Sequence, residues 1–115
     1  MTSMTLALSD DLAQRLRPLE SYLSTVLELS LVGFQTAAAA TATEVIRFLS
    51  GDPSPKEILT YHASERTQER TRRLLALNQA GLLSEEEQRK LDELEKIEHI
   101  VRLLKARVAV ALKDA

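Results

Sequence analysis

The sequence predicts a mainly α-helical protein: a short N-terminal β-ribbon strand, then five or so helices, ending in a hairpin of long helices. The 115 residues are 44% hydrophobic but only 3% aromatic, so the core must consist of Leu, Val, Ile and Ala. Three Gly and three Pro leave few tight turns, which favours helices over a sandwich or a barrel. Apolar residues also recur at helical spacing along most of the chain.

Residues 1–35 are predicted to form a strand and two helices that act as a dimerisation module. In residues 3–8, apolar residues alternate with small or polar ones, the period of two that a strand requires. Ser9 can cap the next helix, whose first turn holds two aspartates that the helix dipole favours. Pro18 should end or kink this helix, or start the next one. Leucines at steps of four then predict a second helix that stops near Gly33.

Residues 36–53 are predicted to be a small-residue connector followed by a short helix. The stretch QTAAAATATEV has little to bury, so we interpret residues 36–40 as a connector, although alanine also allows the helix to continue. Thr41 and Glu44 have the spacing of a capping box, which places the start of the short helix there. The conformation of residues 36–42 is left open.

Residues 54–115 are predicted to form a helical hairpin with a long C-terminal helix. Residues 54–57, SPKE, are a capping box with proline at the first helical position, and Ser64 can cap a helix that Gly81 closes. A second box, SEEE at residues 84–87, begins a helix that runs nearly to the end of the sequence. Apolar residues in this helix alternate steps of three and four, as in a coiled-coil seam: Leu94, Ile97, Val101, Leu104 and Val108.

The charges are unevenly divided between the two halves of the chain. Residues 1–63 hold four cations and seven acids, a net charge of −3, and residues 64–115 hold eleven cations and ten acids, a net charge of +1. A nucleic-acid-binding surface is normally basic, so DNA binding through the acidic first half is expected to be weak. No cysteine, no positively charged leader and no apolar run long enough to span a membrane are present. We therefore expect a cytoplasmic protein without a membrane partner.

The sequence contains no motif that indicates catalysis. It has no Gly-x-Ser-x-Gly elbow, no Ser/His/Asp set and no glycine-rich phosphate loop, so we predict neither enzyme activity nor a cofactor. Glu95 and His99 lie one helical turn apart, but helical di-metal sites use a Glu-x-x-His spacing on two helices. We therefore predict no metal site and expect a local hydrogen bond for His99.

Three arginines are the candidate partner-binding residues. Arg66, Arg70 and Arg73 are four and three residues apart and therefore share one helix face. The simplest interpretation is a solvated face on which Glu65 and Glu69 pair with the arginines. The functional interpretation is contact with an acidic partner or with phosphate, which guanidinium groups bind bidentately. The mixed-sign residues 84–96 are expected to be a solvated outer face.

The predicted strand of residues 3–8, the helix Asp10–Leu16 and the helix around residues 23–31 together resemble the ribbon-helix-helix fold. In that fold two chains pair their strands antiparallel, place the ribbon in the DNA major groove and share one core. This ribbon departs from the family pattern because it has no Arg, Lys, Asn or Gln to read base edges. The resemblance implies a homodimer, or a higher oligomer, whose shared core contains Met4, Leu6, Leu8, Leu12 and Leu16.

The second half resembles the C-terminal region of small uncharacterised antitoxin-like proteins that recur in cyanobacteria and related bacteria. The resemblance lies in SPKEIL and in the run from GLLSEEE to HIVRLLKARVA, with matches at Pro55, Glu57, Ile58, Leu59, Gly81, Leu83, Ser84, Glu98, His99, Val101, Arg102 and Leu103.

Together the two resemblances imply an antitoxin-like homodimer that binds and neutralises a toxin protein, with weak operator DNA binding. The toxin could be a ribonuclease whose acidic metal site attracts the three arginines. The alternative is a helical homo-oligomeric adaptor or structural interaction protein with no DNA or toxin partner. The acidic first half and the wide apolar stripe on the last helix fit this alternative.

Overall fold

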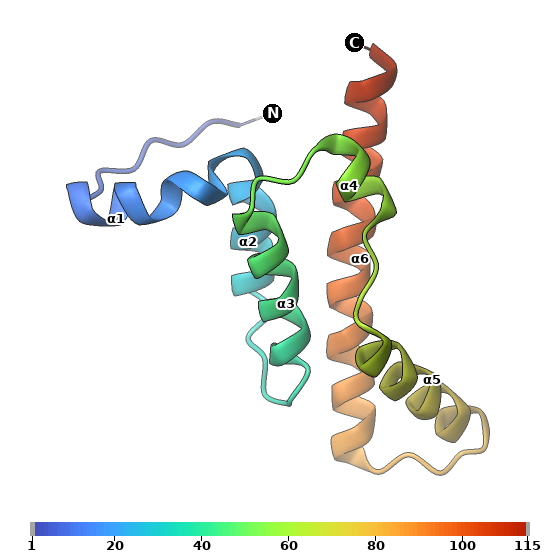
Figure 1. The fold of residues 1–115 in the computed structure, drawn as a ribbon. Coiled ribbons are helices and arrows are strands. Elements are labelled where there is room, and N and C mark those ends of the chain that lie inside the picture. The colour runs from blue at the N-terminus through green and yellow to red at the C-terminus, as the bar shows by residue number, and fades with distance from the viewer. Residues whose placement is uncertain (1, 115) are drawn as a thin grey trace.

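The computed structural model describes residues 2–114, of which 74% are helical. Figure 1 shows a long helix, α6, with the shorter helices arranged around it. The elements in chain order are α1 (Asp10–Leu16), the 3₁₀ helix η1 (Arg17–Tyr22), α2 (Leu23–Ser30), α3 (Ala39–Ser50), α4 (Pro55–Thr60), α5 (Glu65–Gln79) and α6 (Glu85–Asp114).

The predicted N-terminal β-ribbon is wrong, because residues 2–114 contain no strand. Residues 2–9 have no regular secondary structure and precede α1 as a free segment (Figure 1). Alternation of side chains indicates an extended backbone, but a strand also needs a neighbour to satisfy its N–H and C=O groups, and none of the described residues provides one. The expectation of five or so helices is also wrong. Four helices in the described residues have eight or more residues, and the elements α1, η1 and α4 are shorter.

α6 is the spine of the molecule and contacts α2, α3, α4 and α5. Its 30 residues make a rod about 45 Å long at 1.5 Å per residue. α5 precedes it through a tight connection closed by Gly81, whose φ of +71° is easily adopted only by glycine. Figure 1 shows that α5 leaves α6 at a steep angle rather than running alongside it.

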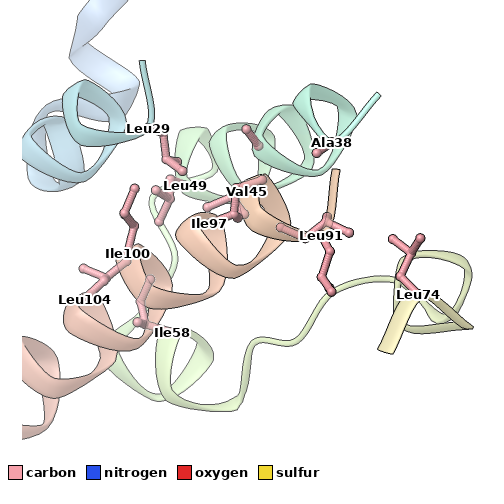
Figure 2. Packing of buried hydrophobic residues seen from close by; sticks show 12 residues of the cluster. Leu29, Ala38, Val45, Leu49, Ile58, Leu74, Leu91, Ile97, Ile100 and Leu104 are labelled. Atoms are coloured by element: carbon pink, nitrogen blue, oxygen red, sulfur yellow. The ribbon is translucent and has the colours of Figure 1, made fainter. Parts of the chain in front are cut away.

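One apolar core joins helices α2 to α6 (Figure 2). Leu29 of α2, Leu49 of α3 and Ile58 of α4 are at most 1% exposed and face α6. In the predicted seam of α6, Leu94, Ile97 and Leu104 are buried, whereas Val101 and Val108 are half-buried at the edge of the core. The seam therefore packs on helices of its own chain.

The serine caps predicted from the sequence are confirmed. Ser9 accepts a hydrogen bond from the backbone N–H of Leu12 at 3.2 Å, and Ser64 accepts one from Thr67 at 3.3 Å. The capping boxes at residues 54–57 and 84–87 both form their two reciprocal hydrogen bonds. Each cap satisfies N–H groups that the first turn of a helix leaves without partners.

The predicted capping box of Thr41 and Glu44 is wrong, because α3 begins earlier, at Ala39. The Thr36 hydroxyl oxygen instead accepts a hydrogen bond from the backbone N–H of Ala38 at 3.1 Å. Four consecutive helix-favouring alanines before Thr41 allow this earlier start. The link between α2 and α3 is residues 31–38, so it begins and ends earlier than the predicted connector of residues 36–40.

Candidate functional site

A groove lies where α5 diverges from α6, and we call it the α5–α6 groove. It is a cavity of about 720 Å³ that is open to solvent on one side. Its polar rim includes His62, Gln68 and Thr71. Its apolar floor consists of Val45, Leu75, Leu91, Leu94, Ile97 and Val101.

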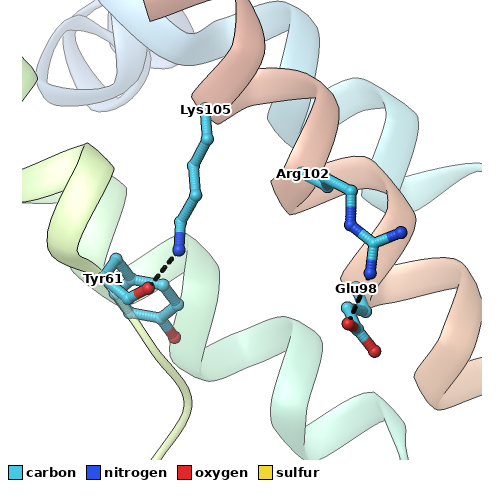
Figure 3. A network of polar contacts seen from close by, with 4 residues as sticks. All are labelled: Tyr61, Glu98, Arg102 and Lys105. Atoms are coloured by element: carbon cyan, nitrogen blue, oxygen red, sulfur yellow. Dashed lines mark hydrogen bonds and ion pairs between the residues drawn. The ribbon is translucent and has the colours of Figure 1, made fainter. Parts of the chain in front are cut away.

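The non-helical link of residues 61–64 forms one end of the groove, and α6 holds it in place. Lys105 donates a hydrogen bond from Nζ to the backbone carbonyl of Tyr61 at 2.5 Å (Figure 3). The ring of Tyr61 packs against that of Phe48 of α3, with centroids 4.4 Å apart. Burial, together with the nearby Glu44 carboxylate, raises the pKa of Tyr61, which keeps its hydroxyl neutral. The link is thus fixed by α3 and α6, which are distant in sequence.

The start of α5 is also tied to the rest of the molecule. Thr67 donates a hydrogen bond from its hydroxyl to the carboxylate of Glu44 on α3 at 3.2 Å. Gln68 donates from Nε2 to the backbone carbonyl of Ala63 at 2.7 Å. These bonds set the direction in which α5 departs, and therefore the opening of the groove.

The floor of the α5–α6 groove has no charged side chain, and its rim has both positively and negatively charged ones. Arg72 and Lys105 supply positive charge, and Glu95 and Glu98 supply negative charge. The carboxylate of Glu98 is already paired with Arg102 at 2.7 Å (Figure 3). An apolar, uncharged segment would meet this floor without leaving a charge unpaired, and the rim would offer hydrogen-bond partners.

The N-terminal segment forms an exposed apolar surface. We call residues 2–9 the apolar arm. α1 projects away from the helices packed on α6, and the arm turns back from its outer end (Figure 1); no residue of α1 is buried. The five residues predicted as a dimer core do not form a core within one chain: Leu16 is half-buried, and the exposed fractions of the others are 86% for Met4, 65% for Leu6, 41% for Leu8 and 39% for Leu12.

The molecule exposes more surface than a compact chain of its size. Its accessible surface is 8451 Å², whereas a compact monomer of 12.8 kDa has about 6,300 Å². Its radius of gyration is 16.1 Å, against about 13 Å for a compact 115-residue domain. Roughly a quarter of the surface is thus in excess. This excess is larger than the roughly 800 Å² that each partner buries in a standard protein–protein interface.

The three candidate partner-binding arginines lie on α5 but do not line the groove. Arg66, Arg70 and Arg73 are all exposed. Within residues 2–114 none of them has an acidic oxygen within 4 Å, so the expected pairing with Glu65 and Glu69 is not formed there. Their role in binding stays a prediction.

Glu93 is a buried charged residue that sequence reasoning missed, and it lies outside the α5–α6 groove. The prediction that residues 84–96 form a solvated face is wrong at this position, because Glu93 is only 5% exposed. Its carboxylate accepts hydrogen bonds from the backbone N–H of Gln35 at 2.9 Å and from the N–H and hydroxyl of Thr36 at 3.1 and 2.5 Å. Burial alone would raise the pKa of Glu93, but these hydrogen bonds outweigh it and lower the pKa. A signal was present, because Glu93 is four residues before Ile97, on the apolar stripe.

Glu95 and His99 are exposed on α6, and no three His, Asp or Glu residues among residues 2–114 are placed to hold a metal ion. No helix in the described part of the chain has the length and apolar character needed to cross a membrane. Comparison with models of protein families, with curated proteins and with solved structures finds no match to this chain. The resemblances to ribbon-helix-helix and antitoxin-like proteins are therefore neither supported nor refuted by known proteins.

Proposed function

We propose that this chain is a helical homodimeric interaction protein that associates through its apolar arm and α1. The observation that carries the proposal is the exposure of Met4, Leu6 and Leu8 on a segment that lies outside the apolar core of its own chain. Large exposed apolar patches on a protein mark interaction surfaces. The excess accessible surface supports the same proposal, because burial in a dimer would remove it from water.

The proposal does not include DNA. The predicted ribbon, which would have entered the major groove, is absent from residues 2–114. Residues 2–9 also contain no cationic side chain to neutralise phosphate. The proposed homodimer corresponds to the alternative interpretation of the sequence, a helical homo-oligomeric adaptor. The cytoplasmic location stays a prediction.

Light scattering after size-exclusion chromatography tests the proposal. We expect the protein at micromolar concentration to have twice the 12.8 kDa of one chain. The variant with Met4→Ser, Leu6→Ser and Leu8→Ser should run as a monomer. Each large apolar side chain contributes about 1.5–3 kcal/mol when fully buried, so the dimer should weaken by at least about a thousandfold.

A matched pair of single substitutions controls this experiment. Leu6→Ser and Leu82→Ser change leucines of nearly equal exposure, 65% and 68%, but Leu82 lies in the connection between α5 and α6. Only Leu6→Ser should weaken the dimer. A monomeric wild type, or equal weakening by both variants, would contradict a dimer formed through the arm.

Neutralisation of a toxin is the second candidate function, and the exposed arginine face of α5 favours it. Arg66, Arg70 and Arg73 are exposed, and within residues 2–114 no acid is paired with them. Such a face is available to an acidic partner, since guanidinium groups bind carboxylates bidentately. Placing a like charge in an interface costs several kcal/mol, so charge reversal at Arg70 should abolish binding to that partner.

Co-expression with proteins captured from the host tests this second candidate. A captured toxin should arrest growth when made alone, and the wild-type chain should relieve the arrest. Arg70→Glu should not relieve it, whereas Arg17→Glu should, because Arg17 is exposed on η1, outside the arginine face. Relief by Arg70→Glu as complete as that by the wild type would remove the arginine face from the proposal.

A further inference from the structure

We propose that the apolar arm of one copy lies in the α5–α6 groove of a second copy, and that the two copies exchange arms reciprocally. This inference rests on the proposed homodimer and names where its arm binds. It pairs the exposed apolar arm with the open α5–α6 groove. The accessible apolar side chains of the groove are Leu75, which is 41% exposed, and the half-buried Val101; the other floor residues are at most 7% exposed. Reciprocal exchange closes the assembly at two copies, because each groove then holds one arm.

The lengths of the arm and the groove agree. The arm has eight residues, and an extended backbone rises about 3.3 Å per residue, which gives about 26 Å. The part of α6 that lines the groove runs from residue 91 to residue 105, about 21 Å at 1.5 Å per residue. An extended arm thus covers the whole groove.

The chemistry of the two surfaces also agrees. In an extended segment alternate side chains point to opposite sides, so Met4, Leu6 and Leu8 share one side and can meet the apolar floor. Residues 2–9 contain no charged side chain, so none would be buried against the floor unpaired. The backbone N–H groups of the arm need acceptors on binding. The Gln68 Oε1 and Thr71 Oγ1 oxygens at the rim can accept from them, because the donors of these two side chains are already bonded to Ala63 and Thr67.

The groove of the same chain is out of reach of its arm. The arm ends where α1 begins, and in Figure 1 this attachment point lies at the outer end of α1, on the side of the molecule away from α5. A second copy therefore supplies the occupant.

Engineered disulfides test the inference cleanly, because the natural sequence contains no cysteine. One preparation carries Leu6→Cys in the arm, and another carries Leu75→Cys in the groove floor, where the leucine is 41% exposed. The two are mixed, allowed to exchange subunits and oxidised. We expect a covalent dimer on a non-reducing gel that forms only in the mixture, since the bound arm gives the two thiols a high effective concentration.

The matched control mixes Leu6→Cys with Leu82→Cys, outside the groove, and should yield at least about tenfold less covalent dimer. Circular dichroism and light scattering check that each variant is folded and dimeric. Thr71→Cys, on the same wall, replaces Leu75→Cys if the latter is unfolded.

Three results would overturn the inference but leave the homodimer intact. Cross-linking of Leu6→Cys alone would place the two arms against each other. A chain with both Leu6→Cys and Leu75→Cys that oxidises to a monomer would place the arm in its own groove. A noncovalent dimer that gives no cross-link in the mixture would place the arm on another surface. A monomer in light scattering would overturn the proposed function as well.

Discussion

Truncation of Leu49 to alanine is expected to lower the free energy of unfolding by about 3 kcal/mol, within the 2–5 kcal/mol typical of buried leucines. The Leu49 side chain is fully buried on α3, and Figure 2 places it beside Leu29 and Val45 at the face of α6. The substitution removes apolar burial and leaves a cavity that the surrounding helices can close only in part. Since α3 meets α6 here, the loss weakens the attachment of the first half of the chain to the spine.

Urea denaturation followed by circular dichroism measures this effect. The chain concentration must be held constant, because the stability of a dimer depends on it. Leu82→Ala is the matched control, since it is the same substitution at a residue that is 68% exposed, and it should change stability by less than about 0.5 kcal/mol. Equal losses for the two variants would mean that Leu49 does not occupy a packed core.

The helix starts were predictable from the sequence because capping is local. The Ser54 hydroxyl and the Glu57 carboxylate reach their partners within three residues, so a short stretch of sequence contains the whole interaction. The same holds for Ser84 and for the stop at Gly81, where a single residue has to adopt a positive φ. The long extent of α6 was predicted from similarly local signals, the capping box at residues 84–87 and the steps of three and four between its apolar residues.

The N-terminal strand and the groove were not predictable, for different reasons. Alternating residues 3–8 specify only which side chains share a side of an extended chain, and a strand requires a partner that the described chain does not supply. The groove depends on the direction of α5, which is set by contacts such as Thr67 with Glu44, 23 residues apart, and on the link before α5, which Lys105 fixes through Tyr61, 44 residues away. Sequence spacing on one helix contains no information about such a contact.

Replacement of Glu93 by glutamine is expected to destabilise the protein by about 2 kcal/mol at pH 7. The position of Glu93 on the apolar stripe was visible in the sequence, but its partners, 57 and 58 residues away, were not. Hydrogen bonds to a charged group contribute roughly 1.5–3 kcal/mol, and the glutamine amide would place an N–H₂ group opposite a backbone N–H donor. The Glu93 carboxylate ties residues 35 and 36, just before α3, to the middle of α6. Glu95→Gln, on the same helix but exposed, is the control and should change stability by less than about 0.5 kcal/mol.

The pH dependence of the Glu93 effect separates the charge from the shape of the side chain. The folded protein lowers the pKa of Glu93 from its usual value near 4.5, so between that value and the folded pKa the unfolded chain binds more protons. The stabilisation is therefore fully present above pH 4.5 and is lost as the pH falls through the folded pKa. The stability difference between the wild type and Glu93→Gln should be constant from pH 7 to about 5 and should shrink below pH 4.5. A difference that stays constant down to pH 3 would mean that Glu93 acts through packing and not as a carboxylate.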